Sequence, residues 1–351
     1  MLTARDYLAV MKVKTAELNA IKVLDGDVSG IVPLWEDVPP KQAAVHKLLP
    51  DRLPDTWPAQ QPYMLDVAHL DQVGFAGLDI HPLLASAAAA QALGHTMLPV
   101  CGPFRSSEHR SVCAQAVGIL GNGLALRITG ADCENAEELS SACKSLLLMC
   151  GCDRVSVDLI LDLGACYGQS LGAVLQNARW MLTAAGGASN WRSIALVGAS
   201  MPDGLGPLTI GWHTLPRVEW RAWKQFHAGP EMDRRELVYG DYNINSPALF
   251  SGSRATILAQ LRYTTDDSFM VYRGHPTTGP NGQGYDQFYE ICAELVQKDE
   301  WRGEDYSWGD AVISMKSTGA GGCGNAQTWR QIGTSHHLQT VREQLANHHA
   351  L

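Results

Sequence analysis

The feature that most constrains the fold is a series of apolar runs of strand length, each ending near a polar residue and followed by a loop or a helix-like segment. Eight such runs begin near residues 7, 31, 63, 96, 123, 154, 193 and 237. Short apolar runs bounded by turn residues are typical of buried strands. Eight consecutive strand-and-helix units favour a (β/α)8 TIM-like barrel over a doubly wound sheet, which usually needs five or six strands. We therefore predict an α/β fold with a barrel over residues 1–260.

The remainder of the chain, residues 261–351, does not continue this pattern. It contains one more strand-like run at 268–275, a loop dense in glycine and proline at 274–284, and a helix-like segment at 285–298. These apolar runs are too few for a separate hydrophobic core. We expect residues 261–351 to form a C-terminal α+β elaboration packed on the barrel.

Composition narrows the classes of function. The net charge of −9 disfavours non-specific binding to nucleic acid or to an anionic membrane. The sequence lacks a run of about 18 uncharged apolar residues, so we expect no membrane span. The nine cysteines have irregular spacing without a CxxC pair, and the N-terminal segment does not read as a signal peptide. This pattern indicates a reducing, cytoplasmic setting.

The candidate site consists of ionisable residues at or beside the predicted strands. In a barrel, the carboxyl ends of the strands share one mouth, where barrel enzymes place their sites. Carboxylates beside basic groups could hold a divalent cation and a phosphate, or divide into general acid and base. The sequence does not select a metal. The candidate catalytic residues are Asp241, Glu36, Asp66 and Asp158, and the candidate substrate-binding residues are Lys12, Lys14, Arg127, Tyr242, Arg273 and His275.

A structural interpretation competes with this one. Barrel interiors need paired charges, because a buried charge must have a partner, and Arg127 with Asp158 or Asp66 would supply such a pair. Arg262 and Trp329 could likewise belong to an aromatic and cationic shelf or to a hydrophobic seam beneath the elaboration. The glycine-rich segments lack the Walker ending and the GxGxxG pattern, so we do not expect a phosphate-binding loop of either kind.

Several short motifs resemble the phage-related "beta protein" family. They are the opening Tyr7, Lys12-x-Lys14-x-x-Glu17-Leu18 and Ile31-Val32-Pro33-Leu34-x-Glu36, followed by Tyr239-Gly240-Asp241-Tyr242, Leu261-Arg262-Tyr263-Thr264, Tyr272-Arg273-Gly274, Ser307-Trp308-Gly309-Asp310, Trp329-Arg330 and Ser335-His336-His337-Leu338. The resemblance implies a context of phages, satellite elements and bacterial mobile regions, in some cases beside a toxic gene that the beta protein counters. It carries no established reaction and no catalytic residues.

Two functions from different classes remain open at this point. The first is a binding protein that restrains a partner from a neighbouring gene in a phage-defence or toxin-neutralisation locus. The second is a barrel enzyme acting on a phosphorylated or nucleotide-like small molecule, with strand-end carboxylates and basic groups that clamp the anion. The family resemblance favours the first, and the strand-end residues favour the second.

Overall fold

The computed structural model contains the predicted barrel. It describes residues 2–24, 27–39, 47–53, 57–71, 80–232, 236–249 and 257–349. Eight parallel strands close in the order β1-β2-β3-β4-β5-β6-β7-β9. Their bounds are β1 Tyr7–Lys12, β2 Ile31–Glu36, β3 Tyr63–Asp66, β4 Met97–Cys101, β5 Leu124–Thr129, β6 Val157–Ala165, β7 Ser193–Ala199 and β9 Val238–Asp241. The prediction of a (β/α)8 TIM-like barrel is therefore confirmed.

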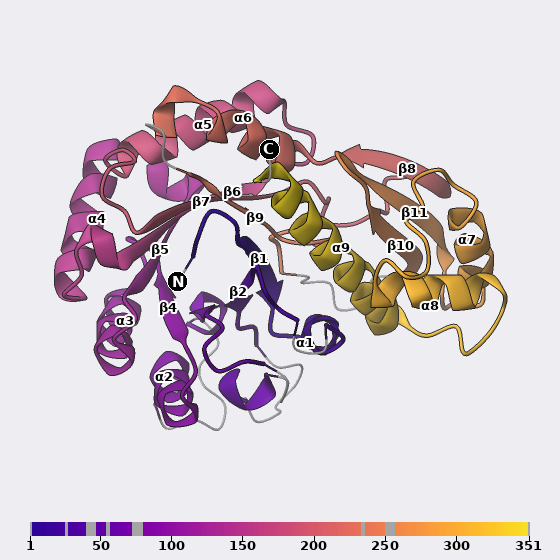
Figure 1. Cartoon of the computed structure of the whole chain (residues 1–351), viewed down its shortest axis with the longest axis horizontal. Helices are drawn as coiled ribbons and strands as arrows, with labels where there is room; N and C mark the ends of the chain where they lie inside the picture. The colour runs from indigo at the N-terminus through magenta and orange to yellow at the C-terminus, as the bar shows by residue number, and fades with distance from the viewer. Residues whose placement is uncertain are drawn as a thin grey trace.

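Helices surround the strands on the outside of the barrel (Figure 1). Their bounds are α1 Thr15–Lys22, α2 Pro82–Leu93, α3 Ser107–Leu120, α4 Ala136–Met149, α5 Leu171–Ala184 and α6 Val218–His227. Several begin at side-chain caps that the sequence supplies: Ser106, Asn135 and Ser170 each accept a hydrogen bond from a backbone N–H in the first turn. These caps fix where the loops at the carboxyl ends of the strands turn into helix.

A second sheet lies beside the barrel and has the antiparallel order β10-β11-β8 (Figure 1). Its strands are β8 Gly211–Pro216, β10 Leu258–Thr264 and β11 Ser268–Pro276, and it is accompanied by α7 Gln287–Leu295 and α8 Trp308–Ser317. The chain thus leaves the barrel after β7 to form β8, returns for α6 and β9, and leaves again for β10. The elaboration therefore draws one strand from within residues 1–260.

The last helix, α9 Ala326–His348, joins the two parts. It packs against β1 and α1 of the barrel and against β10 and α8 of the elaboration. Figure 1 shows it beginning beside α8 and the second sheet and running back over the barrel, where the C-terminus lies. Its buried residues include His336 and His337, which contact groups in both parts.

The barrel core has two layers. Alternate residues of each strand point inwards, where Leu8, Val10, Leu34 and Ile160 form a packed interior, while the others meet the surrounding helices. The interior is narrow at Gly240, because a Cβ there would lie 2.9 Å from the carbonyl oxygen of Leu8. Gly240 therefore faces inwards, and its neighbours Tyr239 and Asp241 face the helices. Within the described residues, no helix is both long and apolar enough to cross a membrane.

Candidate functional site

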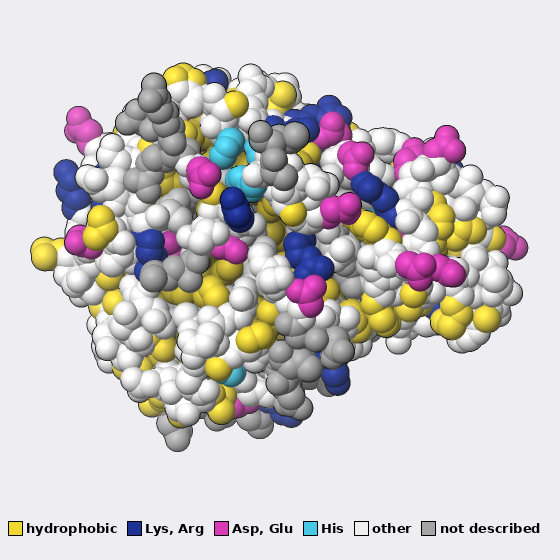
Figure 2. Space-filling view, in the orientation of Figure 1, with side chains coloured by type: hydrophobic (Ala, Val, Ile, Leu, Met, Phe, Trp, Pro, Cys, Tyr) yellow, Lys and Arg dark blue, Asp and Glu magenta, His cyan; other side chains and the backbone are white. Residues whose placement is uncertain are grey.

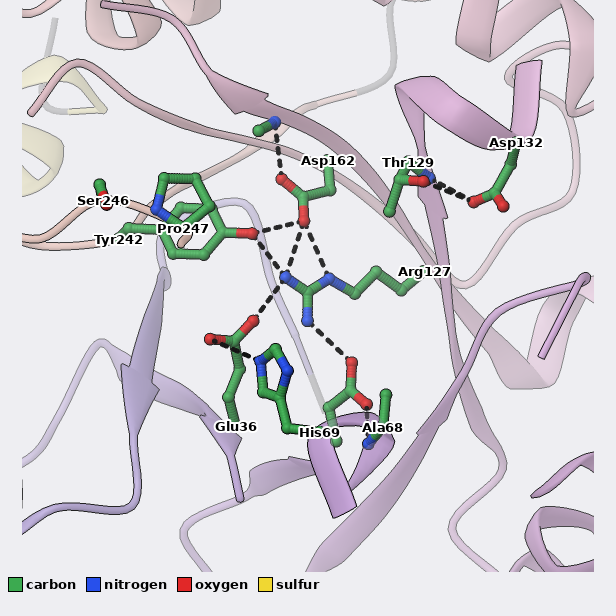
Figure 3. Close-up of polar contacts among 12 residues, drawn as sticks. Glu36, Ala68, His69, Arg127, Thr129, Asp132, Asp162, Tyr242, Ser246 and Pro247 are labelled. Atoms are coloured by element: carbon green, nitrogen blue, oxygen red, sulfur yellow. Dashed lines mark hydrogen bonds and ion pairs between the residues drawn. The ribbon is translucent and has the colours of Figure 1, made fainter. Parts of the chain in front are cut away.

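The centre of the barrel mouth is the guanidinium of Arg127, which projects from β5 (Figure 3). Its Nη1 donates to Oδ2 of Asp66 at 2.8 Å, and its Nη2 donates to Oε1 of Glu36 at 2.9 Å. Asp162, at the end of β6, accepts from both Nε at 2.9 Å and Nη2 at 2.7 Å. The hydroxyl of Tyr242 lies 2.5 Å from Nη2 and donates to Asp162 at 2.6 Å. One cation thus holds three carboxylates from three strands.

Two further cations complete this group, which we call the Arg127 cluster. Arg105 donates to Oδ2 of Asp66 at 3.1 Å, and Lys12 lies 3.9 Å from Oε2 of Glu36. His69 lies 3.7 Å from the same oxygen. The three carboxylates of the cluster balance the charges of Lys12, Arg105 and Arg127. All members except Arg105 and His69 are buried.

The acidity of the cluster follows from these contacts. Burial raises the pKa of Glu36, but the charges of Arg127 and Lys12 outweigh it, so this pKa lies below its ordinary value. Burial also raises the pKa of Asp66, but the charges of Arg105 and Arg127 outweigh this effect. The pKa of Asp66 therefore lies well below its usual range. Both side chains are therefore carboxylates at neutral pH, with weak basicity and no proton to donate. Burial also lowers the pKa of Lys12, whose ammonium is held by the carbonyl of Ser246 at 3.0 Å.

Asp241 lies outside this mouth, although we expected it there. It sits on the helix-facing side of β9, where Tyr239 donates to Oδ2 at 2.7 Å and Tyr7 donates to Oδ1. His337 of α9 lies 3.0 Å from Oδ2, and Arg217 lies 3.8 Å from it. Asp241 therefore joins β9 to β1 and to α9. Its catalytic role stays a prediction that this geometry does not support.

The protonation of this second group is consistent with its hydrogen bonds. Burial lowers the pKa of His337, so the imidazole is neutral at pH 7 and its Nε2–H donates to Asp241. Its Nδ1 is then free to accept from the hydroxyl of Thr264 at 2.8 Å. The buried Arg217 provides the positive charge opposite Asp241. The adjacent histidines point to different partners, since His336 contacts Asp310 at 2.8 Å.

Asp158 lies at the opposite end of the barrel from the Arg127 cluster. It is the second residue of β6, and its carboxylate receives two hydrogen bonds of 2.8 Å from Arg192 and one of 2.8 Å from Ser193. These contacts close the amino-terminal end of the barrel. Of the two partners that the sequence suggested for Arg127, Asp66 forms an ion pair with it and Asp158 does not.

The remaining predicted residues divide between the two parts of the molecule. Tyr242, Lys12 and Arg127 belong to the cluster, and Lys14 stands half-buried at the start of α1. Arg273 and His275 lie on β11 of the second sheet, where the backbone N–H of His275 donates to Gln287. Among the described residues, no contact joins these two side chains to the Arg127 cluster.

Three members of the cluster, Asp162, Arg105 and His69, were not predicted from the sequence. Asp162 had a usable signal, because strand residues two apart share a face and Asp162 is nearer than Asp158 to the carboxyl end of β6. Arg105 and His69 lie in the segments that follow β4 and β3. Loop residues of this kind carry no periodic signal that fixes their direction.

One further group near the mouth has the residue types of a metal site. Asp71, His81 and His109 each place a ligand atom within 4.8 Å of the others. Nδ1 of His109 lies 2.9 Å from Asp71. Against the effect of burial, the interaction with Cys101 and then that with Asp71 raise the pKa of His109 to about 9. Nδ1 of His81 accepts from the backbone N–H of Leu83 at 3.2 Å. A neutral His81 therefore carries its proton on Nε2, the atom facing Asp71, which fits an ion-pair network better than a metal centre.

The fold and the mouth define a TIM-like barrel protein with a charge-balanced polar cluster at the carboxyl ends of its strands. The family model described as Beta protein matches residues 7–343, nearly the whole length. The chain belongs to the beta protein family. No curated protein matches it.

Proposed function

We propose that this protein is a cytoplasmic binding protein that restrains a partner encoded beside it in a phage-defence or toxin-neutralisation locus. The observation that carries the proposal is the charge balance of the Arg127 cluster. The three carboxylates already have cationic partners at hydrogen-bond distance, and all three are buried. A mouth arranged in this way serves as a rigid platform for a partner.

The same contacts argue against acid–base chemistry at the mouth. A general acid needs a pKa near the working pH, whereas those of Glu36 and Asp66 are lowered. A divalent cation would have to displace Arg127 from three carboxylates, leaving a buried guanidinium without its partners. Protonating these carboxylates at neutral pH and displacing Arg127 from them would each carry a large free-energy cost.

Apolar side chains on the loops around the mouth support a docking surface there. Phe104 follows β4 and Tyr167 follows β6, and both side chains are more than two-fifths exposed. Exposed Leu148, in the last turn of α4, and exposed Val155, in the connection from α4 to β6, lie at the opposite end of the barrel. Each end of the barrel thus has two exposed apolar side chains, and the pair at the far end serves as a control for the pair at the mouth.

The experiment co-expresses the chain with the product of each gene adjacent to its own and measures complexes by size-exclusion chromatography and titration. We expect one such product to bind, and the double variant Phe104→Ser/Tyr167→Ser to weaken binding about tenfold, about 1.4 kcal/mol. The control, Leu148→Ser/Val155→Ser, should bind normally. Failure of every neighbouring product to bind, or equal binding by both variants, would overturn the proposal.

The enzymatic alternative keeps one supporting observation. Oε2 of Glu36 is buried without a hydrogen-bond partner and faces Lys12 at 3.9 Å and His69 at 3.7 Å. A phosphorylated or other anionic small molecule could enter between these two basic groups. If Glu36→Gln abolishes the protective effect in cells while the partner complex is retained, the enzymatic function replaces the binding function.

A further inference from the structure

A cavity opens where the second sheet meets α7 and the start of α9. Its enclosed part measures about 50 Å³, room for a few water molecules or a group of similar size, and the space measures about 440 Å³ when its open, solvent-exposed side is included. Its wall combines β10, the segment before α7, the first turns of α9 and Ile244 after β9. Every side chain discussed above for the barrel mouth lies outside this wall.

The cavity is lined by two guanidinium groups, Arg262 and Arg330, and the described residues of its wall include no carboxylate. Among the described residues, Arg262 donates to neutral oxygens only, the carbonyl of Ile244 and Oε1 of Gln260 at 2.8 Å. Burial, together with the charge of Arg330, lowers the pKa of Arg262 to about 9. Its positive charge is therefore retained at neutral pH, and no carboxylate of the described residues pairs with it.

Arg330 is only weakly neutralised. Its Nη1 lies 3.8 Å from Oε1 of Glu17, which is beyond hydrogen-bond distance. Burial raises the pKa of Glu17, against the effect of the charge of Arg330. Two cations thus face one cavity whose described wall carries no carboxylate, an arrangement that an incoming anion would stabilise.

The other side of the cavity is aromatic. The rings of Phe288 and Trp329 stack with centroids 3.8 Å apart and planes 4° apart, and Tyr285 stacks on Phe288 at 6.2 Å and 11°. Phe288 and Trp329 are buried, whereas Tyr285 is half-buried and borders the cavity. Aromatic faces of this kind accept a planar ring in offset stacking.

The start of α9 adds to the positive potential. Ala326, its first residue, lines the cavity, and the 23-residue helix points its amino terminus to this region. The partial positive charge of a helix amino terminus favours a nearby anion. Figure 2 shows basic and acidic side chains interspersed over the visible face, so the unbalanced pair inside the cavity contrasts with the outer surface.

We propose that this cavity binds the phosphate group of a monoester whose planar ring, as in a mononucleotide, lies on the open side of the cavity. The dianionic phosphate would pair with Arg262 and Arg330, whose planar donors match phosphate oxygens. The ring would lie against Tyr285. This site is independent of the partner-binding function proposed above, because it shares no lining residue with the barrel mouth.

Isothermal titration of the full chain tests the site with three probes: adenosine monophosphate, inorganic phosphate and adenosine. We expect the monophosphate to bind at least tenfold more tightly than either of the other two, because only it supplies both the dianion and the ring. Equal affinity for the monophosphate and for inorganic phosphate would overturn the aromatic part of the site. Equal affinity for the monophosphate and for adenosine would overturn the cationic part.

Two matched variants of α9 locate the binding. Arg330→Gln should weaken binding of the monophosphate about tenfold or more, whereas Arg342→Gln, which alters an arginine paired with Asp27 elsewhere on the helix, should leave it unchanged. Tyr285→Leu should weaken the monophosphate and leave inorganic phosphate unaffected. Equal affinities in all three variants and the wild type, or equal loss in Arg330→Gln and Arg342→Gln, would place the ligand elsewhere and reject the proposal.

Discussion

The Arg127 cluster and the Arg262–Arg330 cavity both gather charged groups, but they differ in how those charges are neutralised. In the cluster, Arg127 has carboxylate oxygens within 2.9 Å on three sides. In the cavity, the partners of Arg262 within the described part of the chain are neutral oxygens, and a second arginine is nearby. The first arrangement is complete by itself, and the second is completed by an anion. Position at a barrel mouth is thus a weaker indication of ligand binding than unbalanced charge.

The largest effect should come from removing the centre of the cluster. Arg127→Met leaves Glu36, Asp66 and Asp162 close together without their shared cation, so we expect a loss of about 3 to 5 kcal/mol in the free energy of unfolding. Urea denaturation monitored by circular dichroism measures it. A loss below about 1 kcal/mol, as is typical of exposed ion pairs, would mean that these charges are solvated and the mouth is open to ligands.

Acid should reveal the same cluster. The folded-state pKa values of Glu36 and Asp66 are lowered, so the stability they contribute is present above their unfolded values near pH 4 and is lost as the pH falls further. A carboxylate of this kind typically contributes about 2 to 3 kcal/mol. Stability measured from pH 5 to pH 2 should fall steeply in the wild type and less steeply in Arg127→Met. Parallel slopes would contradict the assignment.

Glu219 lies outside both the Arg127 cluster and the cavity, and its contribution to stability should depend on pH in the opposite direction. Burial and the nearby charge of Asp241 raise its pKa to about 7, against the opposing effect of Arg217. A raised pKa means that stability is present below the unfolded value and declines as the pH rises through the folded value, by about 2 to 3 kcal/mol between pH 5 and pH 8.

Replacing this carboxyl group by an amide supplies the matched control for that titration. Glu219→Gln should remove this alkaline decline, leaving a flatter profile between pH 5 and pH 8 in thermal unfolding. If the wild type is equally flat, the carboxyl group is already ionised at pH 5, and burial does not control its pKa.

The smallest effect should come from the cavity. Arg330→Gln removes one of two neighbouring like charges, and its side chain is 40% exposed. Without ligand we expect the free energy of unfolding to change by less than about 0.5 kcal/mol. Because the substitution relieves repulsion between two like charges, we expect the change to be a slight gain in stability. A loss comparable to that of Arg127→Met would show that the cavity is balanced internally, and the contrast between the two regions would disappear.

Much of the site was predictable where a strand pattern fixed the position. Glu36, Asp66 and Lys12 end their strands and Arg127 lies near the end of β5, and all four meet at the mouth as expected. Asp162 could have been chosen by counting two residues at a time from Asp158. Arg105 and His69 could not, because the direction of a loop side chain depends on the packing of its neighbours.

The sequence by itself determined the eight barrel strands, because an apolar run followed by a capped helix is a local pattern. Only the tertiary structure decided that Asp241 faces α9. Strands of a parallel barrel are apolar on both faces, so their pattern does not state which residues point inwards. The close approach of Leu8 to Gly240 settles that choice. The same holds for charge: the sequence supplies the ionisable residues, but distance and burial decide which of them are already neutralised.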